Sequence, residues 1–373
     1  MTHDVIIVGA GIGGATAAYF LRQAGLRILI IEKEKLPRYK PCAGGVPCVA
    51  FEPFPFSFAP VIECDVTAVR FSFRGQHEFT VPVPAHTVAM VMRDQLDYHV
   101  LQQAQADVVE GEKVAMVGED STGVVVRAEG GREWRGRYLI GADGANSAVA
   151  RILGLRRRKV LGVALEAEVP RRGDLAGAFD AEALFVLGAV ESGYLWVFPK
   201  RDHLSVGIGV FRKGAQHPRG ILEADMSQRG IVLKGIPVHA HPLPLYWRHE
   251  PLHTRRSLLV GDAAGLVDPL LGEGVRYAMR SGWLAARAIL SGDLGRYSRD
   301  VHRQVGGHLT AARAWAWAFY RYPWGSFRLG VSNPCVSADF VRMFAGRLTY
   351  GGMLLHVPWY AWEWVKKRMP VCA

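Results

Sequence analysis

The sequence predicts an α/β protein whose N-terminal part folds around a parallel sheet, and three observations lead to this prediction. Residues 4–8 and 26–31 are short, almost wholly apolar runs, which are typical of parallel strands buried on both faces. A glycine-rich turn at 9–14 and a segment of helical composition at 15–23 separate these runs. Strand, turn, helix and strand in this order form a βαβ unit, which predicts a Rossmann-like domain.

Further segments predict the remaining elements. We expect helices at 94–106 and 274–290 and another buried strand at 257–260. A hairpin is predicted from 66–73 and 78–83, and two strands flank a Gly-Gly turn at 124–127 and 132–140. A second, antiparallel sheet is predicted from the β-rich segments 161–169, 183–187, 194–198 and 204–211.

Composition narrows the kinds of protein that this chain can be. It has 373 residues, of which half are hydrophobic and 21% are charged, and this balance excludes an intrinsically disordered chain. The five cysteines are odd in number and include no C-x-x-C pair, which favours a reducing, cytoplasmic compartment over a disulfide framework. The net charge of +11 indicates an anionic partner: a nucleic acid, a membrane surface or a phosphorylated ligand.

The glycine-rich turn matches the pattern G-x-G-x-x-G through Gly9, Gly11 and Gly14. Glycine lets the backbone approach a pyrophosphate closely, and the following helix offers free N–H groups at its N-terminus. Glu32 ends the second strand 18 residues after Gly14, where an acid accepts hydrogen bonds from ribose hydroxyls. Together these features predict a dinucleotide site, although a glycine-rich turn alone would suit any α/β protein.

Two later segments extend this pattern. Asp143-Gly144 follows a predicted strand, and Asp262 follows another one before Gly272 and Gly274 lead into a helix. In this order the segments resemble the FAD-binding set of the flavoprotein hydroxylase superfamily. The resemblance implies a Rossmann-like FAD-binding domain of the hydroxylase type. It places Asp262 at the ribitol chain of FAD, and the loop with Gly272 and Gly274 near the pyrimidine edge of the flavin.

Arg93 matches an arginine that contacts the cofactor in that superfamily. Its position at a predicted helix start is equally typical of a solvated charge, so both interpretations stay open. The sequence contains no second G-x-G-x-x-G. We therefore expect any nicotinamide cofactor to bind transiently, without a domain of its own.

Two more motifs narrow the family. The first is the stretch 39–47, YKPCAGGVP, and the second is the stretch 194–200, YLWVFPK, which Gly207 and Gly209 follow. Together they resemble the geranylgeranyl reductase family, whose members saturate isoprenoid double bonds in precursors of chlorophyll, archaeal lipids or quinones. The resemblance implies hydride transfer from reduced flavin to a geranylgeranyl or other polyprenyl chain, plus protonation. It leaves NADPH and reduced ferredoxin open as the electron donor.

The first motif contains the predicted catalytic residue, Cys42. A thiol held near the flavin can donate a proton, whereas the alternative is a small residue that fills space in a Pro/Gly-rich loop. The predicted cofactor-binding residues also include Lys33, Ala43 and Gly44; Ala43 stands where the family commonly has glycine.

The second motif suggests a binding surface for a polyprenyl chain. Tyr194, Trp196 and Phe198 point to one face of their strand and form an apolar wall. Gly207 and Gly209 lack side chains at alternate positions of the next strand, which predicts a slot beside that wall. An ordinary aromatic sheet core is the alternative interpretation.

These assignments predict three parts of the chain. A discontinuous FAD-binding domain comprises 1–60, 92–160 and 252–295, and a substrate-binding sheet domain comprises 61–91 and 161–251. The helical end, 296–373, has nine Lys or Arg against two acids from residue 301 onward, and six of the ten tryptophans. Its composition suits docking on a membrane surface or a helical cap over the substrate. Nucleic-acid binding is not predicted, because no known module accounts for the charge.

Two other flavin chemistries share part of this pattern. An FAD-dependent monooxygenase, a hydroxylase or an epoxidase, would have the same FAD segments, and only the Cys42 and Tyr194 stretches favour the reductase. A flavin-dependent halogenase has a W-x-W-x-I-P motif, from which Tyr194 and Phe198 depart. No metal site is predicted, because none of the 13 histidines forms a metal-spaced cluster.

Overall fold

The computed structural model describes residues 3–175, 177, 179–212 and 217–366. The chain divides into two compact units, each made of three segments of the chain. The first comprises residues 1–40, 92–161 and 242–310, and the second comprises 41–91, 162–241 and 311–373. Residues 41–60 therefore fall in the second unit, although the sequence analysis placed them with the first. Their strand β3 (Gly45–Pro47) pairs with β7 (Val88–Val91) of that second unit. The functions assigned to the parts stay predictions.

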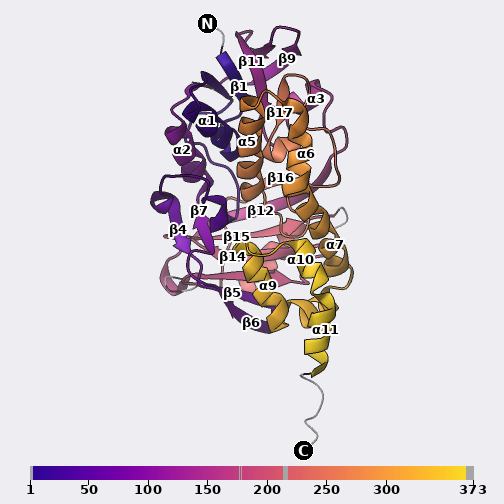
Figure 1. Cartoon of the computed structure of the whole chain (residues 1–373). Helices are drawn as coiled ribbons and strands as arrows, with labels where there is room; N and C mark the ends of the chain where they lie inside the picture. Colours follow the sequence, from indigo (N-terminus) through magenta and orange to yellow (C-terminus); the bar gives the residue numbers. More distant parts are fainter. Residues whose placement is uncertain (1–2, 176, 178, 213–216, 367–373) are drawn as a thin grey trace, which may run out of the picture. The chain divides into compact units, whose positions relative to one another are not determined.

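The first unit contains the βαβ arrangement that the sequence predicts. Strand β1 (His3–Val8) pairs in parallel with β2 (Ile28–Glu32) on one side and with β11 (Glu133–Gly141) on the other. Helix α1 (Ile12–Gln23) connects β1 to β2 and packs against two further helices. The sheet order is β8-β2-β1-β11-β10-β9, and β17 pairs with β11. Figure 1 labels β1, β9, β11 and β17 of this sheet. The other elements are β8 (Asp107–Glu110), β9 (Val114–Glu119), β10 (Val124–Ala128), β17 (Ser257–Leu259), α2 (Arg93–Ala104), α3 (Ala148–Ile152), α5 (Val275–Leu290) and α6 (Tyr297–Val301).

Strands β1 and β2 of this sheet are largely buried, and helix α1 packs against both of them. Every residue of β2 is buried, and so are the last four of β1. Such continuous apolar runs are typical of parallel strands between two layers of helices. The carboxyl ends of β1, β2 and β11 lie side by side, as their parallel register requires. Ligands of open α/β sheets bind at this edge, and the turn that follows β1 lies there.

The second unit is built on a seven-stranded sheet with the order β16-β12-β15-β14-β13-β5-β6. Its strands are β5 (Ala68–Phe73), β6 (His77–Pro82), β12 (Val160–Pro170), β13 (Glu182–Leu187), β14 (Gly193–Pro199), β15 (His203–Val210) and β16 (His239–Leu245). The predicted hairpin is confirmed as the antiparallel pair β5–β6. The predicted antiparallel sheet is confirmed for its four segments, since β12, β15, β14 and β13 pair antiparallel in this order. The hairpin joins this sheet through a parallel pairing of β13 with β5. Their long connection allows either direction, whereas a tight hairpin would enforce the antiparallel one.

The two faces of this sheet differ in chemistry. One face is aliphatic, and its core side chains include Leu195, Val206 and Ile208, with Leu222 and Met226 of α4 (Pro218–Gln228). Residues of opposite parity along the same strands form the other face, which is mostly aromatic. The sequence pattern of alternating residue types thus places the second motif on a buried face.

A small sheet and a set of helices complete the second unit. The order β3-β7-β4, with β4 at Ile62–Asp65, anchors the end of the loop that contains Cys42. The helices are α7 (Gly307–Arg321), α8 (Pro323–Gly325), α9 (Pro334–Phe344), α10 (Tyr350–Leu355) and α11 (Val357–Lys366). Helix α10 ends at Leu355 and α11 begins at Val357, so Pro358 stands in the first turn of α11. Lys367 and Arg368, two of the basic residues counted in the helical end, lie outside the described residues. Among the helices described, none has the length and hydropathy that crossing a membrane requires.

Candidate functional site

The turn after β1 and the start of α1 require glycine at two positions, through backbone conformation at Gly9 and through lack of space at Gly14. Gly9 has φ +103°, and a Cβ there would lie 2.4 Å from the carbonyl oxygen of Ala142. A Cβ on Gly14 would lie 2.2 Å from the oxygen of Gly9. A Cβ on Gly11 would approach the guanidinium of Arg38 to 3.1 Å. The turn therefore packs closely against neighbouring backbone. It leads directly into α1, whose first N–H groups lack intrahelical partners.

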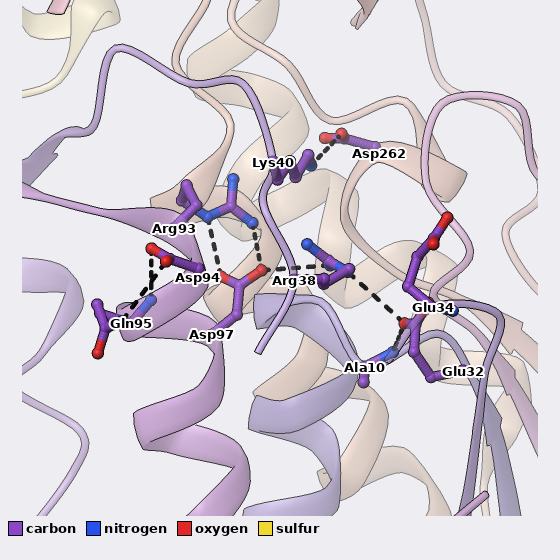
Figure 2. A network of polar contacts seen from close by, with 10 residues as sticks. All are labelled: Ala10, Glu32, Glu34, Arg38, Lys40, Arg93, Asp94, Gln95, Asp97 and Asp262. Atoms are coloured by element: carbon purple, nitrogen blue, oxygen red, sulfur yellow. Dashed lines mark hydrogen bonds and ion pairs between the residues drawn. The ribbon is translucent and has the colours of Figure 1, made fainter. Parts of the chain in front are cut away.

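Glu32 lies directly beside this turn, as Figure 2 shows. Its Oε2 accepts a hydrogen bond from the N–H of Ala10 at 2.7 Å, and its Oε1 accepts one from the N–H of Glu34 at 3.1 Å. The carboxylate is almost fully buried, with Arg38 Nε 3.8 Å from Oε2. Lys33, by contrast, is exposed and forms an ion pair with Glu34. An anchored acid at the end of β2 thus lies next to the anion-binding turn.

Arg93 is buried, so its interpretation as a solvated charge is wrong. Its Nε and Nη2 donate to the two oxygens of Asp97 at 2.8 and 2.9 Å (Figure 2). Arg38 also contacts Asp97, through a hydrogen bond of 3.4 Å from Nη2 to Oδ2. The sequence analysis missed Arg38 and Asp97. The spacing of four residues between Arg93 and Asp97 on a helix was an available signal.

Asp262 lies in the third chain segment of the first unit, residues 242–310. Its Oδ2 accepts a hydrogen bond from Lys40 Nζ at 3.1 Å, and both side chains are largely buried. A Cβ on Gly274 would lie 3.5 Å from Oδ1 of Asp262, which places this carboxylate next to the N-terminus of α5. The backbone at Gly272 is left-handed, with φ +69°. Arg156 holds the loop from 261 to 265, because its Nη1 donates a hydrogen bond to the backbone carbonyl oxygen of Asp262 at 3.0 Å.

Asp143 orders its own turn. Its Oδ1 accepts a hydrogen bond from the hydroxyl of Ser147 at 2.5 Å, and its Oδ2 accepts from the N–H groups of Ala148 and Val149 at 2.7 and 3.1 Å. Gly144 has φ +78°, which the sharp turn requires. Asp143 thus satisfies the N-terminus of α3. Its predicted contact with a cofactor stays a prediction.

In the second unit, Lys200 connects the two family motifs. Lys200 closes the stretch 194–200, and its Nζ is fully buried, donating to the oxygens of Ala43 and Val91 at 2.9 and 2.7 Å. Gly44 has φ +75°, and a Cβ there would lie 2.1 Å from Val91 O and 2.2 Å from Lys200 Nζ. Burial lowers the pKa of Lys200. Cys42 itself is half-buried and forms no disulfide. The sequence analysis quoted Lys200 but assigned it no role.

The aromatic wall is present, but the predicted slot is filled. Tyr194, Trp196 and Phe198 are buried, and neighbouring rings lie 6.3 Å apart from centroid to centroid. A Cβ on Gly207 would lie 2.2 Å from Cζ2 of Trp196, so the indole itself lies across this glycine. Likewise a Cβ on Gly209 would lie 3.1 Å from the ring of Phe211. The glycines accommodate neighbouring aromatic rings, and the expectation of an open slot is wrong. Contact of these residues with a substrate stays a prediction.

Glu166 is the residue of this face that the sequence analysis missed. It lies in β12 opposite Gly207 of β15 and is almost fully buried. Its Oε1 accepts a hydrogen bond from the hydroxyl of Ser205 at 2.6 Å, and this hydroxyl accepts one from Nε1 of Trp196 at 3.2 Å. Within the described ranges, no group of three or more His, Cys, Asp or Glu is arranged to hold a metal ion.

Comparisons with known proteins agree with this geometry. Residues 7–37 match the model of the NAD(P)-binding Rossmann-like domain. Digeranylgeranylglycerophospholipid reductase 2 of Methanothermobacter thermautotrophicus is 33% identical over 338 residues, which cover 83% of this chain and 86% of that protein. The chain belongs to the geranylgeranyl reductase family. Chloroplastic geranylgeranyl diphosphate reductase of Oryza sativa is 29% identical, with 80% of this chain and 71% of that protein covered. Menaquinone reductase of Mycobacterium tuberculosis is 32% identical, with 79% and 78% covered.

Solved structures show the same fold. A geranylgeranyl bacteriochlorophyll reductase-like protein from Thermoplasma acidophilum has a TM-score of 0.74 and 24% identity, with 86% of this chain and 87% of that chain covered. A flavin-dependent brominase has a TM-score of 0.72 and 20% identity, with 93% and 94% covered. At these identities the likeness concerns the fold alone. The halogenase and monooxygenase alternatives therefore have only the shared fold in their favour.

This geranylgeranyl reductase family member is an FAD-dependent oxidoreductase, and the first unit suits FAD. The turn at Gly9 and Gly14 has no room for a Cβ beneath it and leads into the N-terminus of α1, as a diphosphate requires. The same unit contains two ion pairs, Glu32 with Arg38 and Asp262 with Lys40. They offer acceptors for hydroxyl groups and cations for phosphates.

Proposed function

We propose that this protein saturates carbon–carbon double bonds of a geranylgeranyl or other polyprenyl chain, carried by a diphosphate, a lipid or a chlorophyll precursor. The observation that carries the proposal is the pair of hydrogen bonds from Lys200 to Ala43 and Val91. The bond to Ala43 joins the two stretches that resemble the reductase family, 39–47 and 194–200. In this arrangement the buried ammonium has one evident task, which is to hold the turn that contains Cys42.

The residues of the first unit would hold FAD. The free N–H groups at the start of α1 would face the diphosphate, Glu32 would accept from ribose hydroxyls, and Asp262 would accept from the ribitol chain. Arg93 is a further candidate contact, oriented by Asp97. FAD, when bound and reduced, supplies the hydride. We propose NADPH or reduced ferredoxin as the source of these electrons.

The second unit would bind the chain and supply the proton. An isolated alkene accepts hydride poorly, so protonation must accompany or precede hydride transfer, and water must be kept away. The buried rings of Tyr194, Trp196 and Phe198 offer a dry, apolar wall. Cys42, in the turn held by Lys200, is the proposed proton donor. Anaerobic mixing of the dithionite-reduced holoenzyme with geranylgeranyl diphosphate should reoxidise the flavin, and a flavin that stays reduced with every prenyl substrate would contradict the proposal.

The C-terminal helices offer a surface for a membrane that holds the prenyl substrate. Large apolar side chains are exposed on α7, α10 and α11 and between these helices, namely Trp317, Tyr322, Trp324, Leu329, Leu354, Leu355, Val357, Trp359 and Trp362. Tryptophan and tyrosine favour the interface of a bilayer, and basic residues favour anionic headgroups. We propose that this surface docks on anionic lipid.

Replacing Trp359 and Trp362 together with serine should weaken binding to anionic vesicles. Burying one large apolar side chain contributes about 1.5–3 kcal/mol, so we expect at least about tenfold weaker binding in a sedimentation assay. The matched control replaces two exposed apolar residues elsewhere, Met116 and Val232, with serine. Equal vesicle binding by both double variants would overturn the docking proposal.

A further inference from the structure

We propose that Glu166 is the proton reservoir of the reduction, a neutral carboxylic acid that restores the proton of Cys42 after the thiol has protonated the alkene. This inference rests on the proposed function and deepens it. Glu166 is 3% exposed in the middle of β12, on the same sheet face as Trp196. The turn that contains Cys42 contacts the same sheet face, since Lys200 Nζ donates to the oxygen of Ala43 at 2.9 Å and a Cβ on Gly45 would lie 3.4 Å from the ring of Phe198.

The hydrogen bonds of Glu166 have a defined direction. An indole N–H is only a donor, so the oxygen of Ser205 accepts from Trp196 at 3.2 Å. The Ser205 hydroxyl then donates to Oε1 of Glu166 at 2.6 Å. Because Oε1 is the acceptor, a proton on this carboxyl group belongs on Oε2. This second oxygen is buried and has no hydrogen-bond partner among the described residues.

The surroundings of Glu166 shift its pKa in both directions. Burial raises its pKa, while the Ser205 hydroxyl, the Lys200 ammonium and the Cys42 N–H lower it, and Glu168 raises it. Lys200 forms its hydrogen bonds with the carbonyl oxygens of the Cys42 turn, at 2.7 and 2.9 Å. Burial thus favours the neutral acid, and a nearby cation limits the penalty when the proton leaves.

The proposed steps conserve atoms and electrons. The alkene gains a proton at one carbon, as the S–H bond of Cys42 breaks, and a hydride from the reduced flavin at the other. The O–H bond of Glu166 then breaks and the S–H bond forms again, leaving a carboxylate that regains a proton from solvent.

The first test needs no activity. Infrared difference spectra of the wild-type protein across a pH titration should contain a protonated carboxyl band that persists above the ordinary range for glutamic acid. Glu166→Gln should remove this band, and Glu168→Gln, on the same strand and face, should retain it. In the wild type the hydroxyl of Ser205 stabilises the carboxylate form of Glu166. Ser205→Ala removes this hydrogen bond, so the band of the protonated carboxyl group should disappear at a higher pH than in the wild type. Absence of the band from the wild type would overturn the proposal.

The second test follows the number of turnovers. In Glu166→Gln the thiol still holds one proton, so the first double bond should be reduced at nearly the wild-type rate. Later turnovers should be about a hundredfold slower, as expected for loss of a positioned acid, and Glu166→Asp should restore part of the rate. Unchanged steady-state reduction in Glu166→Gln would overturn the inference. Failure of the wild type to reduce any prenyl chain would instead refute the proposed function, while the infrared result would stand by itself.

Discussion

Lys200→Met is expected to destabilise the protein and to abolish most of its prenyl reduction. The substitution leaves the carbonyl oxygens of Ala43 and Val91 buried without a donor. Each unsatisfied group costs about 1–3 kcal/mol, and relief of the buried charge offsets only part of this cost. We expect a clearly lower midpoint of thermal unfolding and, in the folded fraction, a Cys42 turn that no longer holds its position.

Lys234→Met is the matched control, because Lys234 is an exposed residue of the same unit. It should leave both the unfolding midpoint and the activity unchanged. Thiol labelling provides an independent measurement of the turn, and Cys42 should react faster in Lys200→Met than in the control. A Lys200→Met protein with wild-type stability and wild-type turnover would refute the role of this ammonium.

Gly14→Ala should prevent tight FAD binding. The added methyl group would lie 2.2 Å from the oxygen of Gly9, which is backbone and has no rotamer to escape into. Overpacking of this kind costs about 1–3 kcal/mol, which corresponds to about tenfold to hundredfold weaker binding. Fluorescence titration of the apoprotein with FAD measures the change directly.

Gly118→Ala is the control for this substitution, since Gly118 lies in the same unit with open space around the position of its Cβ. It should bind FAD as the wild type does. If Gly14→Ala also retained wild-type affinity, the turn after β1 would not be the diphosphate site.

Local patterns made the first unit predictable. The turn at Gly9 and the acid at Glu32 belong to one βαβ unit, so strand, turn and helix could be inferred from neighbouring residues. Arg38 and Asp97 could not be inferred in the same way, because their contact joins segments far apart in the chain. The residue types in a sequence do not show which charged side chains form ion pairs when they lie far apart in the chain.

The second unit was predictable in its strands and less so in its side chains. Alternation placed Tyr194 and Trp196 on one face, but it could not reveal that the indole lies across Gly207. Glu166 interrupts an apolar strand, a pattern that usually indicates a solvated face, and its burial depends on Ser205 and Trp196 of other strands. The parallel pair of β13 and β5 likewise depends on the path of the whole chain.

The most direct test of the proposed function is mass spectrometry of a prenyl substrate after anaerobic incubation with the reduced, FAD-loaded protein. Geranylgeranyl diphosphate should gain pairs of hydrogen atoms, and in heavy water both atoms of each pair should be deuterium, because the donors of the proton and of the hydride both exchange with solvent. Geranylgeranylated lipid and chlorophyll precursors are the next substrates in the same assay. Unchanged masses for all of them, together with oxygen incorporation under air, would contradict the reductase and support a monooxygenase.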